Sequence, residues 1–115
     1  MAMDKGLLSG STTMLVLKLL EEGDKYGYQM IEELRRRSDE TFQLKAGTLY
    51  PILHSLENEG MVEAYDSAAE GARVRKYYHL TQTGKKLLGQ KRREWNSYAA
   101  AVNQVLQGGE SCAAY

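Results

Sequence analysis

The chain has few or none of the residues that mark several large classes of protein. It holds one cysteine, Cys112, so no internal disulfide can form and no cluster of thiolates can bind a metal. No apolar run approaches the about 18 residues that a membrane span needs. The first residues also lack the basic segment and apolar core of a secretory signal. We therefore expect a cytoplasmic protein in which Cys112 is a free thiol.

Catalytic and metal-binding motifs are missing too. The sequence has no G-x-S-x-G, no phosphate-binding glycine loop and no pair of carboxylates placed for acid–base chemistry. His54, His79 and Cys112 do not have the spacing of metal ligands. We expect neither an enzyme nor a bound metal or cofactor.

The chain lacks a net charge, because 15 Lys and Arg balance 15 Asp and Glu. A neutral chain argues against the overall positive field of many nucleic-acid-binding proteins. The cations nevertheless gather in three groups, which are Arg35, Arg36 and Arg37; Arg73, Arg75 and Lys76; and Lys85, Lys86, Lys91, Arg92 and Arg93. Local positive fields therefore remain a feature of the chain.

The sequence does contain a clear helical pattern. Its 115 residues suit one domain with a single compact core. Apolar spacing predicts helices over 12–21, 26–37 and 46–59. Ser11 or Thr12 caps the first, and Gly23 and Gly60 end the first and third. Pro51 has no amide hydrogen and suits a first turn, so the third helix should begin no earlier than about Gly47 or Thr48.

A β-hairpin is predicted after the third helix. Residues 61–65 and 74–80 are rich in β-branched and aromatic side chains, and they flank DSAAEGA, which has the composition of a turn. Alternation along the second strand brings Arg73 and Arg75 to the hairpin tip. We expect Tyr77 and Tyr78 to pack the hairpin onto the helices.

The last predicted helix is long. Thr81 caps it, the pattern continues to about Leu106, and Gly108 with Gly109 ends it. Apolar residues recur at heptad spacing, which is typical of a helix that pairs with another helix. The residues assigned to this dimerisation seam are Leu88, Trp95, Tyr98, Ala99, Val102, Val105 and Leu106. We expect residues 108–115 to form a flexible tail.

This order of elements predicts a mainly α fold with a small β-hairpin, the winged helix-turn-helix. Residues 1–80 would form the DNA-binding domain and 81–107 the dimerisation helix. The outer face of the third helix carries hydrogen-bonding groups of the kind that contact bases and phosphates, namely Lys45, Thr48, Tyr50, His54 and Asn58. The hairpin cations Arg73, Arg75 and Lys76 would supply a second contact with double-stranded DNA. A dimer would then meet two half-sites about one helical turn apart.

Three segments carry a family resemblance: YGYQMIEEL, GTLYPILHSLENEGMV and RKYYHLTQTGKKLL. They resemble PadR-like transcriptional regulators, and the single C-terminal helix resembles that of the smaller subfamily. The resemblance implies a homodimeric repressor of detoxification, efflux or stress genes, relieved by a small aromatic effector.

The resemblance also implies roles for individual residues. The DNA-reading helix matches 45–58 and the wing matches 61–80, so DNA contacts are expected from Thr48, Tyr50, Pro51 and His54. Tyr26 and Tyr28 look like phosphate-contacting positions. Trp95 corresponds to a tryptophan that, with its dimer mate, forms a slot for flat aromatic ligands in some short members.

Three alternatives stay open. Trp95 is equally well explained as a packing residue of the dimer seam with no ligand. Arg35, Arg36 and Arg37 suit a solvated helix end that complements the helix dipole better than a DNA site. The neutral charge also leaves room for a winged helix that binds protein rather than DNA.

Overall fold

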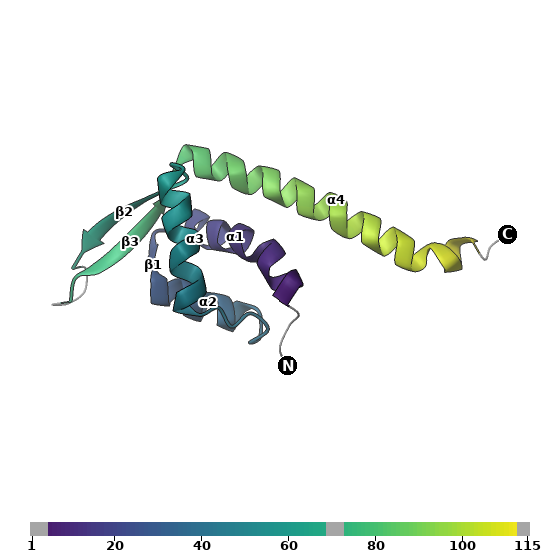
Figure 1. Ribbon diagram of the computed structural model, residues 1–115, viewed down its shortest axis with the longest axis horizontal. Coiled ribbons are helices and arrows are strands. Elements are labelled where there is room, and N and C mark those ends of the chain that lie inside the picture. Colours follow the sequence, from purple (N-terminus) through teal and green to yellow (C-terminus); the bar gives the residue numbers. More distant parts are fainter. Residues whose placement is uncertain (1–4, 69–72, 113–115) are drawn as a thin grey trace.

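The computed structural model describes residues 5–68 and 73–112, with side chains from 11 to 108. Its elements are α1 (Lys5–Glu21), β1 (Lys25–Tyr26), α2 (Gly27–Arg37), α3 (Ala46–Asn58), β2 (Val62–Ser67), β3 (Arg75–Leu80) and α4 (Gln82–Cys112). Figure 1 shows the first three helices and the strands gathered at one end, with α4 projecting away from them. The projection gives the molecule extents of 67 × 32 × 21 Å. The winged helix-turn-helix arrangement is thereby confirmed.

One hydrophobic core joins all the elements except β1. Each helix contributes the apolar residues that recur at helical spacing, and the sheet contributes alternate residues of one face. The buried core consists of Val16, Leu17, Leu19, Leu20, Met30, Leu34, Leu49, Leu53, Leu56, Val62, Tyr78, Leu80 and Leu88. Because this core fixes α3 from behind, the outer face of α3 is held at a defined position.

The sheet has three strands in the order β1-β3-β2, all antiparallel. The β2–β3 hairpin confirms the prediction, whereas β1 was not predicted. Two residues are too few to give an alternating pattern, and β1 exists because Lys25 and Tyr26 pair with Tyr78 and Tyr77 of β3. The predicted turn lies partly outside the described residues, which omit 69–72.

Two predicted helix boundaries are wrong, and so is the later start of the third helix that was argued from Pro51. α1 begins at Lys5 rather than Thr12, and α4 continues to Cys112 rather than ending at Gly108. A glycine inside a helix costs only about 1 kcal/mol, so Gly10 and Gly108 do not interrupt helices that their neighbours favour. α3 begins at Ala46, which leaves Pro51 beyond its first turn with one backbone hydrogen bond fewer. Residues 113–115 of the predicted tail lie outside the described residues.

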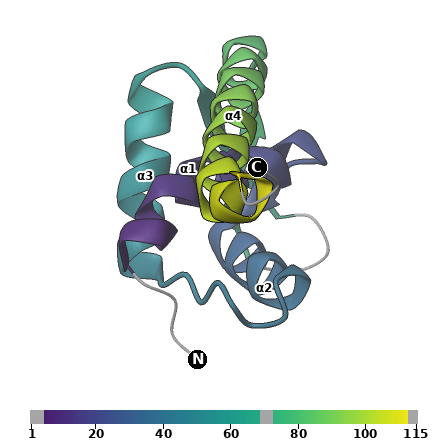
Figure 2. The same cartoon turned by 90° about the vertical axis from the view of Figure 1, so that its right-hand side faces the viewer.

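Thr81 caps α4 as predicted, and it also fixes the start of this helix to the body. The Thr81 hydroxyl accepts the amide of Gly84 at 3.0 Å and donates to the carbonyl of Gly60 at 2.7 Å. Leu88, assigned to the dimer seam from its heptad spacing, is instead a core residue with 1% of its surface exposed. Figure 2 looks nearly along α4, with α3 to one side of it and α2 below. The part of α4 that leaves the body therefore begins after Leu88.

Candidate nucleic-acid interface

The outer face of α3 is open to solvent. Leu49, Leu53 and Leu56 are buried on the inner face, and the period of 3.6 residues turns the polar residues outward. Four predicted contact residues of this helix are exposed, and they are Thr48, Tyr50, Pro51 and His54, with Lys45 exposed at the N-cap. The sequence thus located this face correctly.

The exposed residues of α3 divide between two flanks. Pro51 and Ser55 line a groove of about 700 Å³ together with Leu87 and Lys91 of α4. Tyr50 lies on the other flank, where its hydroxyl sits against Gly27 at the start of α2. Tyr50 and Pro51 are therefore adjacent in sequence but lie on different flanks of the helix.

The start of α2 brings two more predicted residues toward this surface. Tyr28 is exposed, whereas Tyr26 is partly buried. Tyr26 is also the N-cap of α2, and the amide oxygen of the Gln29 side chain accepts its backbone N–H at 3.3 Å. The Tyr26 backbone is therefore held in place by the helix that it begins.

The cations of the wing lie at the free end of the hairpin. Arg73, Arg75 and Lys76 are all exposed. The Arg75 guanidinium lies 4.5 Å from the centre of the Tyr26 ring, which is a cation–π contact. Two residues predicted separately, one at the start of α2 and one on the wing, are thus in direct contact.

A polar cluster that the sequence analysis missed connects the wing to the end of α1. Asp24 accepts hydrogen bonds from the Tyr65 hydroxyl at 2.6 Å and from His79 Nδ1 at 2.8 Å. Partial burial acts to raise the pKa of Asp24, but these two hydrogen bonds outweigh it and the pKa lies below the ordinary value. The same bond to Asp24 raises the pKa of Tyr65. No sequence signal joins these three residues, since 41 and 55 positions separate the partners.

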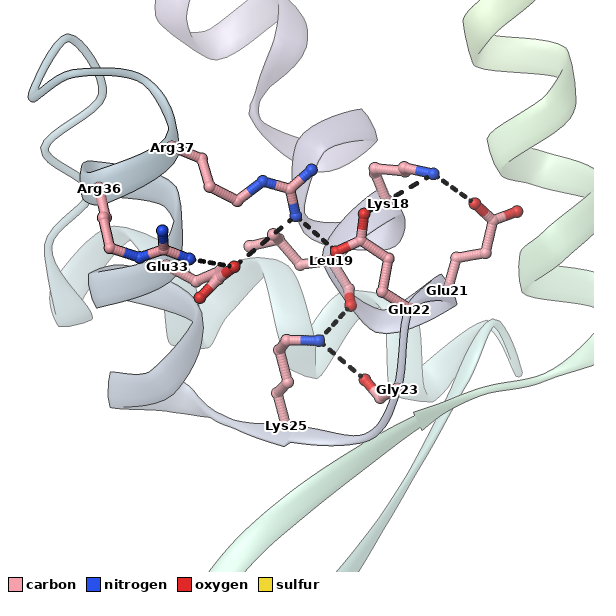
Figure 3. Close-up of polar contacts among 9 residues, drawn as sticks. All are labelled: Lys18, Leu19, Glu21, Glu22, Gly23, Lys25, Glu33, Arg36 and Arg37. Atoms are coloured by element: carbon pink, nitrogen blue, oxygen red, sulfur yellow. Dashed lines mark hydrogen bonds and ion pairs between the residues drawn. The ribbon is translucent and has the colours of Figure 1, made fainter.

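The three arginines at the end of α2 are engaged by carboxylates. Arg36 pairs with Glu33 at 2.8 Å, and Arg37 pairs with Glu22 at the end of α1 (Figure 3). Arg35 similarly pairs with Glu32. This pairing agrees with the interpretation of these residues as a helix end rather than a DNA site.

Lys25 is also engaged within the protein. Its Nζ donates to the carbonyl of Leu19 at 2.7 Å and to that of Gly23 at 3.3 Å (Figure 3). A cation at this place satisfies carbonyls that the end of α1 leaves without helical partners. In contrast, over residues 5–68 and 73–112 no ion pair to a carboxylate involves Lys45, Arg73, Arg75 or Lys76. Within the same residues the cations of α4, Lys85, Lys86, Lys91, Arg92 and Arg93, have no such ion pair either. The positive charge left for an external anion therefore lies at α3, at the wing and along α4.

The second half of α4 exposes apolar side chains. The rings of Trp95 and Tyr98 are 6.3 Å apart, and both are exposed. Val105 and Leu106 have 79% and 75% of their surfaces exposed, while Ala99 is partly covered. Such a continuous apolar stripe is unusual on the surface of a monomer.

Neither a membrane-spanning helix nor a metal cluster is found in the described part of the chain. None of its helices has the length and apolar character needed to cross a membrane. Between residues 5 and 112, leaving out 69–72, no three side chains of His, Cys, Asp or Glu are grouped to hold a metal ion.

The body consists of three helices and carries a wing, and its third helix is exposed with unpaired cations beside it. Together these features define a winged helix-turn-helix DNA-binding protein. The profile of the Transcriptional regulator PadR-like family matches residues 16–90. The chain belongs to this family, and it is a DNA-binding transcriptional regulator.

Known proteins agree with this assignment. A transcriptional regulator of Mycobacterium tuberculosis is 30% identical over 87 residues, which cover 76% of this chain and 78% of the relative. The solved structure of a transcriptional regulator from Clostridium thermocellum is 32% identical with a TM-score of 0.80, covering 87% of this chain and 97% of that one. A PadR family transcription regulator from Clostridium difficile is 34% identical with a TM-score of 0.74, covering 84% and 98%.

Proposed function

We propose that this regulator is a homodimeric repressor that releases its operator when a small aromatic molecule binds between the α4 helices. The proposal rests on one observation above all, the apolar stripe of α4 that its own body leaves uncovered. Trp95, Val105 and Leu106 all belong to this stripe. Genes for detoxification, efflux or stress response are the targets proposed.

The DNA contact is assigned to α3, the wing and the start of α2. α3 would enter the major groove, whose width accepts a helix, and His54, Tyr50 and Thr48 would reach base edges. The wing would follow the backbone or the minor groove, where the negative potential attracts guanidinium groups. Tyr26, Tyr28 and Lys45 would contact phosphates, and Pro51 would border the same surface.

Pairing of two α4 helices would bury the stripe. The residues proposed for this interface are Trp95, Tyr98, Ala99, Val102, Val105 and Leu106. Leu88 is left out because it is already buried within its own body. A dimer of this kind sets the distance between two α3 helices, and that distance must match two half-sites of an operator.

The effector site is assigned to the Trp95 rings of the two subunits. An exposed indole with Tyr98 nearby offers flat faces on which an aromatic molecule can stack, worth on the order of 1 kcal/mol beyond area burial. Lys91, Arg92 and Arg93 precede the tryptophan and favour neutral or anionic aromatics over cations. To act, the effector must bind the DNA-competent and DNA-incompetent spacings unequally.

The proposal is tested on the DNA upstream of the protein's own coding region. We expect footprinting to reveal two protected half-sites, and planar aromatics to quench Trp95 fluorescence saturably while weakening protection. Quenching absent across a broad panel would leave Trp95 as a packing residue only. A stable dimer that protects no duplex would favour the other function considered, a winged helix that binds protein, to which the net charge of zero lends support.

A further inference from the structure

The face of the sheet turned away from the core carries an ordered set of side chains. Pairing places Tyr26 beside Tyr77, and Tyr77 beside Tyr65, on three adjacent strands. Because residues paired across antiparallel strands project to the same face, these three tyrosines form one row across the sheet. We call it the tyrosine row.

The rings of the tyrosine row are in contact. Tyr26 and Tyr77 meet edge to face with centres 5.4 Å apart, and Tyr65 and Tyr77 stack with centres 5.8 Å apart and planes 18° from parallel. Both geometries are favourable for aromatic pairs. The row is nevertheless not a buried core, since Tyr65 is 43% exposed. Burial alone therefore does not explain why three large rings lie in line here.

Each end of the tyrosine row has a specific partner. At one end, the Tyr65 hydroxyl donates to Asp24, which also binds His79 and follows directly after the turn that ends α1. At the other end, the Arg75 guanidinium lies over the Tyr26 ring. The row thus runs from a carboxylate fixed on the body to a cation of the wing.

A hydrogen bond to a carboxylate is stronger than one between neutral groups, so Asp24 fixes Tyr65 more firmly than ring contact alone. With Tyr65 fixed, Tyr77 stacks against it, and Tyr26, the N-cap of α2, meets Tyr77 edge to face. The guanidinium of Arg75 then rests on a ring that is held by its contact with Tyr77. An arginine held in this way loses less conformational freedom when it meets a phosphate.

We propose that Asp24 and Tyr65 are positioning residues for DNA binding, which act through the tyrosine row to hold Arg75 where it meets the duplex. The inference rests on the proposed contact of the wing with DNA. Neither Asp24 nor Tyr65 touches the DNA in this arrangement.

The test compares operator binding by Tyr65→Phe with that by Tyr77→Phe. Tyr65→Phe keeps the stacked ring and the charge but loses the bond to Asp24, and we expect it to weaken binding on the order of five-fold. Tyr77→Phe removes a hydroxyl that has no hydrogen bond in the described part of the chain, so it is the matched control. In an Arg75→Ala background, Tyr65→Phe should cost almost nothing, because its effect passes through Arg75.

For a second variant, Asp24→Asn, two explanations predict opposite changes in DNA affinity. Asp24→Asn removes a negative charge, and electrostatic repulsion alone predicts that DNA binding becomes tighter. Positioning predicts that binding becomes weaker, because a neutral acceptor holds Tyr65 less firmly. Thermal unfolding of both variants checks that the fold is kept.

Two outcomes would overturn the inference. One is wild-type affinity for Tyr65→Phe, and the other is an equal loss with and without Arg75. Failure of the proposed function is distinct, because the unaltered protein would then bind no duplex at all.

Discussion

The hydroxyl of Tyr50 occupies the space that a β-carbon at position 27 would need. Gly27 is therefore required for room rather than for backbone conformation, since its φ is not in the left-handed region. The contact joins the start of α2 to the flank of α3. Two segments assigned to DNA contact are thus fitted to each other.

Gly27→Ala should impair DNA binding more than folding. The new methyl group meets the far end of a side chain, which can swing outward at little cost, but Tyr50 then leaves its position on α3. We expect operator affinity to fall several-fold in a gel-shift assay while the midpoint of thermal unfolding changes little. Wild-type affinity would show that the position of Tyr50 is unimportant for DNA binding.

Two glycines of α4 should respond to alanine in opposite directions. At Gly84 a β-carbon would collide with the backbone carbonyl of Met61 and with Leu80, so Gly84→Ala should be destabilising. At Gly89 the nearest atom is the end of the Arg93 side chain at 3.5 Å, and Gly89→Ala should stabilise by roughly 0.5–1 kcal/mol through helix propensity. Urea unfolding of the two variants measures both effects. Equal changes would contradict the close approach of α4 to the start of β2.

The wing cations should contribute to the salt dependence of DNA binding, whereas the end of α2 should not. The slope of log affinity against log salt is negative. If Arg73 or Arg75 neutralises one phosphate, its replacement by alanine should reduce the magnitude of this slope by about 0.9. Arg36→Ala is the matched control, because Arg36 is exposed but paired with Glu33. Titrations between 50 and 200 mM salt, roughly the range over which such slopes are measured, distinguish the two classes. If Arg36→Ala reduced the magnitude of the slope as much as the wing variants do, the assignment of the phosphate contacts to the wing would be refuted.

A charge placed on the apolar stripe of α4 should dissociate the dimer. Leu106→Glu puts a carboxylate where the proposed interface is dry, and we expect sedimentation to show a monomer that has lost high-affinity operator binding. Gln107→Glu adds the same charge one residue later and about 100° around the helix, so it should remain dimeric. A Leu106→Glu variant that sediments as the unaltered protein does would exclude this stripe as the interface.

The bonds made by Asp24 should leave a signature in the acid stability of the protein. Because its pKa is lowered in the folded state, Asp24 contributes stability above its ordinary value of 3.8, and the contribution is lost as the pH falls below that value. Urea unfolding from pH 6 to about 3 should show the difference between the unaltered protein and Asp24→Asn shrinking toward the acid end. A difference that stayed constant over this range would mean that the carboxylate charge is not involved.

The sequence predicted those parts of the fold that local periodicity determines. The faces of α3 follow from the spacing of Leu49, Leu53 and Leu56, and the cap of α4 follows from Thr81. Heptad spacing, however, is the same for a residue buried in its own body and for one buried by a partner. Leu88 was therefore assigned to the dimer interface although it belongs to the core of its own body. The pairing that makes β1 and the bonds of Asp24 depends on residues distant in sequence, which no local pattern can reveal.

Helix α4 continues beyond Leu88 to Cys112, and none of its described side chains after Leu88 is buried by its own chain. At 1.5 Å per residue this part is about 36 Å long. A tilt of only about 5° at its base moves the far end by about 3 Å, close to the rise of one base pair. Small changes of packing near Leu88 would therefore move the far end of α4 by about the spacing between neighbouring base pairs.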